Sequence, residues 1–335
     1  MEGPIPSWQQ AHGLGAVIDS GGLGVIVLEA IDGGWPALPV VAEGIVRLGL
    51  HRRGVLPPRD LDWFDILLSI DPLASPPWVG LPADTADAAV ARVHEVARTQ
   101  PLAAAVLAQI LRMTLTLTFN HALMLESLGY STLLASSGFR QWREQTPRRI
   151  RPDESAGRVV LLEEEGTLRI RLSRLQSRNA FDAAMRDELV EALEFALHDP
   201  EQRSVVLDGE GPCFSAGGDL GEFGLSADAG VAHAVRVLRS PVRLVQALGA
   251  RLTVRVHGAC IGAGVEVAAA AARLVARHDT SFRLPEVAMG LIPGAGGTAT
   301  MPRRIGRQRT CYLAMTGVDI DAHTARHWGL ADAWE

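Results

Sequence analysis

The sequence contains no lysine, so all 32 of its basic residues other than histidine are arginines. Without lysine the chain cannot form a Schiff base, anchor pyridoxal phosphate or supply the lysine of a P-loop. Cysteine is also scarce, and Cys213, Cys260 and Cys311 stand far apart in the sequence. Neither a disulfide framework nor a zinc site is therefore expected, and a reducing cytoplasm is the simplest predicted location.

The chain also lacks an excess of positive charge, with a formal net charge of -6 and a pI near 5.9. This balance argues against a nucleic-acid partner. The first fifteen residues lack the basic segment and apolar run of a signal peptide. The most apolar stretch, Pro101–Phe119, carries Gln109 and Arg112, and a central arginine costs roughly 2.5 to 3.5 kcal/mol in a membrane. We expect a buried helix there and no membrane partner.

Hydrophobic residues make up 47% and charged residues 21% of the 335 residues, which is typical of a globular protein with one large or two modest domains. In residues 1–150 the pattern predicts mainly helices, over Asp84–Thr99 and over one long run, Pro101–Leu128, with a short strand at Gly24–Glu29. Gln145–Ser155 is rich in arginine, proline and acids without an apolar period, and we place a linker there.

Residues 151–335 follow a different pattern, in which short β-type runs alternate with helical ones. Helices are expected at Asp182–Leu197, with Asp182 as the cap, and at Val231–Leu248, with a break at Pro241. Strands are expected at Arg158–Leu162, Thr167–Leu172, Ser204–Leu207 and Leu252–Val256. This alternation predicts an α/β unit with a parallel sheet.

Two glycine-rich segments each follow an expected strand, and we expect each to open a helix: Cys213–Leu220 (CFSAGGDL) and Gly258–Glu266 (GACIGAGVE). Backbone amides in such turns point at incoming negative charge, so two facing turns would form an oxyanion hole. A dinucleotide fingerprint fits poorly, because Val267 follows Gly264 where a third glycine or alanine is required. A nucleophilic Ser215 is not expected, because it lies outside a GxSxG turn.

The order of four segments resembles the enoyl-CoA hydratase/isomerase (crotonase) superfamily over about half of the chain. These segments are Ser177–Ala180 (SRNA), Phe214–Leu220 (FSAGGDL), Gly258–Glu266 and Pro285–Gly297 (PEVAMGLIPGAGG), followed by Leu313–Gly317 and Gly329–Asp332. The resemblance implies a crotonase-like ββα spiral core over residues 151–335, with residues 1–150 as a mainly helical N-terminal extension. It also implies an acyl-CoA substrate, a role in fatty acid metabolism and a homotrimer or hexamer.

The resemblance assigns roles to individual residues. The amides of Gly218 and Ala263 would hold the thioester oxygen, Glu266 would position and deprotonate water, and Glu286 would deliver a proton to the α-carbon. Coenzyme A itself would be bound around Arg178, Ala180, Ser215, Ala216, Asp219 and Leu220. No metal and no cofactor beyond the coenzyme A of the substrate is implied.

The pattern departs from the family in several places. Gly221 stands where lysine is common, and the sequence ends at Glu335, where family members usually continue with helices that cover the acyl pocket. We expect the apolar segment Pro101–Leu128 to supply this cover or a subunit contact. The sequence predicts an enoyl-CoA hydratase, a lyase. The alternatives are an isomerase or other enolate chemistry, including a cofactor-free dioxygenase, and a non-catalytic subunit that binds acyl-CoA or a partner.

Overall fold

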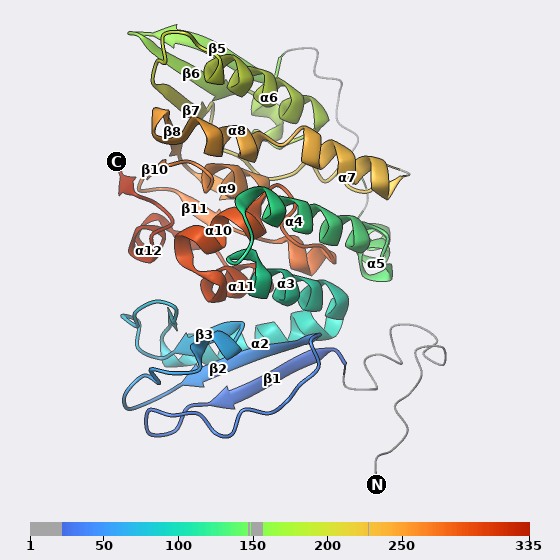
Figure 1. The fold of residues 1–335 in the computed structure, drawn as a ribbon, viewed down its shortest axis with the longest axis vertical. Helices are drawn as coiled ribbons and strands as arrows, with labels where there is room; N and C mark the ends of the chain where they lie inside the picture. The colour runs from blue at the N-terminus through green and yellow to red at the C-terminus, as the bar shows by residue number, and fades with distance from the viewer. Residues whose placement is uncertain (1–21, 147, 149–156, 227) are drawn as a thin grey trace.

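The computed structural model describes residues 22–146, 148, 157–226 and 228–335, so the predicted linker Gln145–Ser155 lies mostly outside the described residues. The described chain forms three sheets surrounded by helices (Figure 1). The N-terminal sheet lies at one end of the molecule, and the hairpin of β5 (Val159–Glu164) and β6 (Thr167–Leu172) lies at the other. Helices of both halves of the chain meet between these ends.

The N-terminal sheet has four parallel strands in the order β1-β2-β3-β4. The expected strand at Gly24–Glu29 is confirmed as β1, whereas the other three strands were not predicted. They are β2 (Ile45–His51), β3 (Ile66–Ser69) and β4 (Val79–Gly80). All four residues of β3 are buried, and a short continuous apolar run of this kind has no period that separates a strand from a buried helix.

Four helices follow this sheet: α2 (Ala83–Thr99), α3 (Pro101–Thr114), α4 (Phe119–Leu134) and α5 (Ser137–Gln145). The prediction of one helix over Pro101–Leu128 was wrong, because the chain breaks between α3 and α4. Thr118 ends the break by accepting a hydrogen bond from the amide of His121, and Thr116 Oγ1 donates to Met113 O. Threonine side chains that bond to nearby backbone compete with the helix, which accounts for the interruption.

The second half contains a six-stranded sheet in the order β13-β10-β8-β7-β6-β5, in which only the β5–β6 pair is antiparallel. Its further strands are β7 (Val205–Gly209), β8 (Leu252–Val256), β10 (Arg273–Ala276) and β13 (Ala333–Trp334). A smaller sheet joins β9 (Ala259–Ile261), β11 (Ser281–Arg283) and β12 (Ile320–Asp321). The mixed α/β core expected from the sequence is present.

The helices of this half surround the two sheets. The predicted helix at Asp182–Leu197 is confirmed as α6 (Ala183–Leu197), with Asp182 accepting from the amide of Met185. The helix with a break at Pro241 is confirmed as α7 (Ala229–Leu238) and α8 (Pro241–Leu248). The others are α9 (Ala263–Ala268), the 3-10 helix η5 (Glu286–Met289), α10 (Gly297–Ile305), α11 (Arg307–Thr316) and α12 (Ala322–Trp328).

Helix α11 joins the two halves of the molecule. All its residues are buried, and it packs against α2, α3 and β3 of the first half and against α10 of the second. Buried apolar side chains of both halves form one continuous cluster, in which Leu48 and Leu107 belong to the same core as Leu207 and Val254. Helix α4 packs against α7 and α10 (Figure 1). The N-terminal helices are thereby fixed against the elements that carry the family-like motifs.

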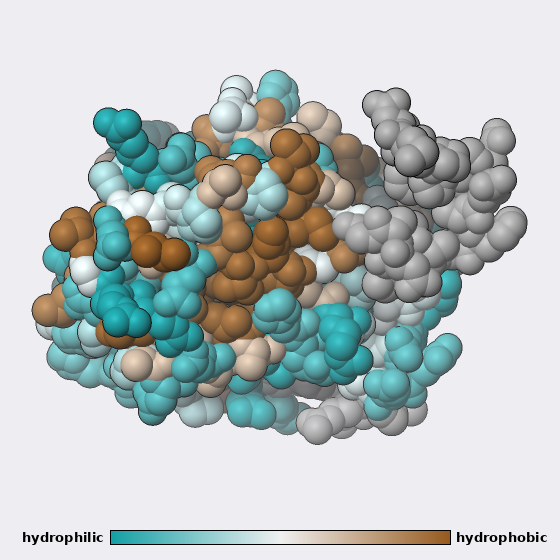
Figure 2. All heavy atoms as spheres, turned by 90° about the horizontal axis from the view of Figure 1, so that it is seen from below, coloured by the Kyte–Doolittle hydropathy of each residue, from teal (hydrophilic) through white to brown (hydrophobic). Residues whose placement is uncertain are grey.

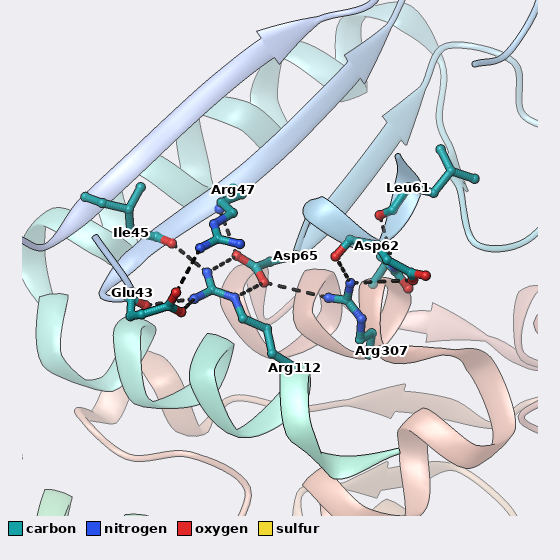
Figure 3. Close-up of polar contacts among 9 residues, drawn as sticks. Glu43, Ile45, Arg47, Leu61, Asp62, Asp65, Arg112 and Arg307 are labelled. Carbon is teal, nitrogen blue, oxygen red and sulfur yellow. Dashed lines mark hydrogen bonds and ion pairs between the residues drawn. The ribbon is translucent and has the colours of Figure 1, made fainter. Parts of the chain in front are cut away.

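A buried carboxylate ties the N-terminal sheet to these helices (Figure 3). Asp65 accepts two hydrogen bonds from Arg112 of α3, with Nε–Oδ1 at 2.9 Å and Nη2–Oδ2 at 2.6 Å, and a third from the amide of Arg47 at 2.9 Å. Nη1 of Arg307 at the start of α11 lies 3.7 Å from Asp65 Oδ1. Arg112 also binds Glu43 at 2.9 Å. We call this group of five residues the Asp65 junction.

Apolar side chains also gather on the surface. In a view onto the end that holds the N-terminal sheet, hydrophobic residues are concentrated near the centre of the face (Figure 2). Exposed apolar residues of this region are Ile31, Val40, Val55 and Leu73. Among the described residues, no helix has the length and apolar character needed to cross a membrane.

Candidate active site

A cavity of about 640 Å³ lies where the two halves of the chain meet. The N-terminal half contributes one side of α4, from Asn120 to Leu134. The second half contributes the loop from Gly218 to Ser226, parts of α6 to α9, Glu286 and the turn Gly294–Gly296. Much of the lining is apolar, with a few polar groups, which is the usual composition of a small-molecule site. Of the apolar segment Pro101–Leu128 that was expected to cover the site, the part in α4 lines the cavity, whereas no residue of α3 is among the lining residues.

The two glycine-rich loops lie side by side at this cavity. Ser215 forms a β-bridge with Cys260, through Ser215 N to Ala259 O and Ile261 N to Ser215 O, both 3.0 Å. A Cβ atom on Gly217 would lie 3.0 Å from Ile261 O, so the close approach of the loops requires glycine there. The second loop opens α9 as expected, but the first leads into turns, and α7 begins only at Ala229.

The backbone amides of Gly218 and Ala263 are available to a ligand. Phe181 bonds to the residues on either side of Gly218, through Phe181 N to Gly217 O and Asp219 N to Phe181 O. The amide of Gly218 itself donates to no described residue, and neither does that of Ala263, the first residue of α9. Both residues line the cavity. Two backbone N–H groups without a described partner in one cavity are the donors that an oxyanion hole would use.

Glu266 lies on α9 with only 2% of its surface exposed. One oxygen, Oε2, accepts hydrogen bonds from the amides of Ala295 at 2.7 Å and Gly297 at 2.8 Å. Burial raises the pKa of Glu266 to about 7, although the two amides act in the opposite direction. Its other oxygen makes no hydrogen bond with a described residue, which leaves it available to water or substrate.

Glu286 opens η5 and faces the same cavity, with 6% of its surface exposed. Its Oε2 atom is buried and has no hydrogen-bond partner among the described residues. Burial, followed by the charge of Glu266, raises the pKa of Glu286 well above its usual range. Gly262 has φ 49°, and a Cβ atom there would lie 2.5 Å from Glu286 Oε1, so a larger residue would displace this carboxyl.

A third buried glutamate, Glu126 of α4, was not predicted from the sequence. Its Oε1 accepts from the amide of Gly296 at 2.7 Å, and its Oε2 accepts from the amide and the hydroxyl of Thr298 at 2.7 and 2.8 Å. Burial, then the charge of Glu266, raises its pKa to about 8. The available signal was an acid directly after the apolar run Ala122–Leu125.

Two further side chains of the cavity were also missed. The ring of Tyr130, one turn after Glu126, packs so closely on Gly294 that a Cβ atom there would lie 2.3 Å from Cδ2. The guanidinium of Arg236 on α7 lies 4.8 Å from the centre of this ring. Arg236 Nε donates to Ser127 Oγ at 3.1 Å, and the guanidinium also contacts Ser131. These contacts join α4 to α7 at the wall of the cavity.

The family model for enoyl-CoA hydratase/isomerase matches residues 163–334. The chain belongs to this family. It is 33% identical over 192 residues to the enoyl-CoA isomerase/hydratase fer4 of Mycosarcoma maydis, covering 55% of this chain and 68% of that protein. It is 32% identical to the 2,3-dehydroadipyl-CoA hydratase of Escherichia coli (strain K12), covering 51% of this chain and 67% of that protein.

The fold agrees with this membership. The crystal structure of an enoyl-CoA hydratase from Thermoplasma volcanium GSS1 superimposes with a TM-score of 0.50 at 28% identity, covering 54% of this chain and 72% of that chain. The α/β crotonase fold predicted from the motifs is therefore confirmed, and the protein is an enzyme of the enoyl-CoA hydratase/isomerase family. The residues matched by the family model do not include α4, which carries Glu126.

The six residues expected to bind coenzyme A occupy the segments that flank the cavity. Of these, only Asp219 is among its lining residues. Asp219 is buried and bonded to Arg174 Nη1 at 2.8 Å, and the hydroxyl of Ser215 donates to Asn179 O at 2.7 Å. These two side chains therefore shape the loops of the family fold, and a ligand would meet the backbone there.

The other four expected residues differ in exposure. Ala180 is buried, and Ala216 donates its amide to Arg178 O at 2.9 Å. Arg178 and Leu220 are exposed. The side chain of Arg178 has no ion-pair partner among the described residues, which suits a phosphate-binding role.

Proposed function

We propose that this member of the enoyl-CoA hydratase/isomerase family is a hydratase that adds water across the double bond of a 2-enoyl-CoA. The observation that carries the proposal is the position of two buried carboxyls, Glu266 and Glu286, in one cavity beside the unbonded amides of Gly218 and Ala263. Hydration requires a base, an acid and a means of stabilising a thioester enolate. The cavity offers one group for each role.

In the proposed reaction, the thioester oxygen accepts hydrogen bonds from Gly218 N and Ala263 N. Glu266 takes a proton from water, the water oxygen bonds to C3, and the electron pair of the C2–C3 double bond moves toward the thioester to give an enolate. Glu286 then transfers its proton to C2, which yields the 3-hydroxyacyl-CoA. Fixed amides that bind the developing oxyanion contribute roughly 3 to 4 kcal/mol each to such a transition state.

The environments of the two glutamates support this division of roles. Glu266 receives two backbone amides and has a pKa of about 7, so it is available as a base near neutral pH. Glu286 has an unpartnered buried oxygen, and burial and the charge of Glu266 raise its pKa well above its usual range, so it keeps a proton to donate. Two carboxyls with different environments can serve as base and acid in one site.

The Glu266→Gln variant tests this proposal on 2-enoyl-CoA and 3-enoyl-CoA substrates. A hydratase should lose roughly 10²- to 10⁴-fold of its hydration rate, because the base that activates water is gone. An isomerase needs only one proton-transferring group, so retention of double-bond migration by the variant would contradict hydration. If the wild-type protein binds acyl-CoA but converts none of a broad enoyl-CoA series, the enzyme assignment for this cavity is wrong and a binding role replaces it.

A further inference from the structure

The turn that leads into α10 is held by two buried carboxylates from different halves of the chain. Four consecutive amides of this turn point alternately to the two: Ala295 and Gly297 donate to Glu266, and Gly296 and Thr298 donate to Glu126. The four N–O distances are 2.7 or 2.8 Å. Neither carboxylate can change position without disturbing the amides that hold the other.

We propose that Glu126 is a positioning residue for the hydration reaction, which fixes the turn that orients Glu266 and helps Glu286 to retain its proton. This inference rests on the proposed function. It extends the site beyond the matched family region, since the contact joins residues 170 positions apart, in α4 and at the start of α10.

The positioning role follows from the hydrogen bonds of the turn. Glu126 holds Gly296 and Thr298, which alternate along the chain with the two residues that bind Glu266. A glutamine in place of Glu126 would bring its amide N–H₂ toward a backbone N–H or the threonine hydroxyl, so it cannot accept all three hydrogen bonds. The turn would relax, and the single oxygen of Glu266 that it holds would move with it.

The protonation role follows from the charges that face Glu126. Glu266 and Glu286 line the same cavity, Tyr130 lies one turn away on α4, and Arg236 is the cation contributed by α7. The charge of Glu126 is among the causes that raise the pKa of Glu286, after burial and the charge of Glu266, whereas the charge of Arg283 at the end of β11 lowers it. His233 on α7 faces Ser127, at 2.9 Å. Three carboxyls this close titrate as a set.

Like charges in the cavity give the direction of the effect. Each ionised carboxyl disfavours ionisation of its neighbours, and the pKa values of all three glutamates are raised. Ionisation of Glu126 at higher pH then adds a negative charge that keeps the proton on Glu286. Removing the carboxyl of Glu126 should therefore lower the pH at which Glu286 loses its proton.

The experiment compares pH profiles of kcat and kcat/KM for wild-type enzyme, Glu126→Gln and Thr114→Val. Thr114 Oγ1 donates to Thr298 O at 2.8 Å, so Thr114→Val removes a buried hydrogen bond to the same turn without changing its charge. For Glu126→Gln we expect kcat to fall roughly 10- to 100-fold, because a small displacement of a catalytic group is costly, with little change in KM. The alkaline limb of the kcat profile, where activity is lost as Glu286 loses its proton, should move to lower pH by about one pH unit.

Thr114→Val should lower the melting temperature and leave the acidic and alkaline limbs of the pH profiles at their wild-type positions. If Glu126→Gln leaves the alkaline limb at its wild-type position, or shifts it no further than Thr114→Val does, the proposal is overturned. Should Glu126→Gln fail to fold, Glu126→Asp keeps the charge on a shorter side chain. It should reduce kcat without moving the alkaline limb, and an unchanged kcat would overturn the positioning role.

Infrared titration of the carboxyl bands separates this inference from the proposed function, because it requires no turnover. The band that disappears in Glu286→Gln identifies Glu286. Its titration midpoint should be about one pH unit lower in Glu126→Gln than in the wild-type protein. An unchanged midpoint would overturn the inference about Glu126 even if the enzyme hydrates enoyl-CoA. A shifted midpoint in a protein that hydrates no enoyl-CoA would instead refute only the proposed reaction.

Discussion

Buried acidic side chains occur at two places in the molecule, the Asp65 junction and the cavity that holds Glu126, Glu266 and Glu286, and their partners differ. At the junction, Asp65 is bonded to the guanidinium of Arg112, with Arg307 nearby. In the cavity, Glu126 and Glu266 are bonded to backbone amides and one hydroxyl, and no described arginine forms an ion pair with any of the three glutamates.

This difference in partners separates a structural acid from a group suited to proton transfer. An arginine beside a carboxylate fixes its charge and ties two elements together, and breaking such a buried pair leaves an unpaired charge. Carboxyls that face one another in an apolar cavity hold their protons to higher pH, near the range in which enzymes work. Replacing an acid by its amide should therefore have opposite consequences at the two places.

The largest effect is expected for Glu286→Gln in the cavity. The variant loses the proton that we assign to C2, so kcat for hydration should fall by roughly 10²- to 10⁴-fold. Its melting temperature should stay at or above the wild-type value, because a buried carboxyl with an unpartnered oxygen is replaced by a neutral amide. Enzyme assays and thermal unfolding on the same preparation check both. A variant with a lower melting temperature and an unchanged kcat would contradict the proposed difference between the cavity and the junction.

The matched change at the junction, Asp65→Asn, should act on stability instead. It leaves Arg112 and Arg307 without the buried negative charge, which should lower the free energy of unfolding by about 3 kcal/mol. The turnover of the folded fraction should be preserved, because Asp65 is not among the residues that line the cavity. Denaturant unfolding and active-site titration measure the two quantities. Loss of turnover without loss of stability would show that the junction takes part in the reaction.

The pH dependence of stability gives an effect of the opposite sign to an ion pair, and it arises in the cavity. The pKa of Glu126 is raised from 4.5 to about 8 and that of Glu266 from 4.5 to about 7. At a pH between 4.5 and the raised values, the folded protein therefore binds more protons than the unfolded chain. Stability should therefore fall as the pH rises through this window, which should appear as a lower melting temperature. The fall should be smaller in Glu126→Gln, and an equal slope in both proteins would contradict the raised pKa of Glu126.

The smallest effect is expected for Glu43→Gln at the exposed side of the junction. Glu43 binds Arg112 at 2.9 Å, but 74% of its side chain is exposed to solvent. Such a pair contributes little, so the free energy of unfolding should change by less than about 1 kcal/mol. Denaturant unfolding of Glu43→Gln and Asp65→Asn under the same conditions provides the comparison. A loss as large as that of Asp65→Asn would mean that burial does not distinguish the partners of Arg112.

The sequence predicted the parts of the site that lie in motifs. Glu266 and Glu286 stand in glycine- and proline-rich segments whose order resembles a known family, and the structure places both in one cavity with Gly218 and Ala263. The strands β5 to β8 and helix α6 were also predicted, because their apolar periods and the cap at Asp182 are local features. These features depend on neighbours in the sequence, which is why they can be read from it.

The parts that were missed depend on distant contacts. Strands β2 to β4 are short apolar runs whose type is decided by pairing with one another, and β4 has only two residues. Glu126 belongs to no motif, and its partners lie 170 and 172 positions further along the chain. An acid inside an apolar helix signals that a partner must exist, but the sequence does not show that the partner is the start of α10.

The most direct test of the account is to incubate the wild-type protein with a 2-enoyl-CoA in D₂O and identify the products by NMR and mass spectrometry. Hydration by Glu266 and Glu286 predicts a 3-hydroxyacyl-CoA with deuterium incorporated at C2. Migration of the double bond without addition of water, or deuterium incorporated only at C4, would contradict the account.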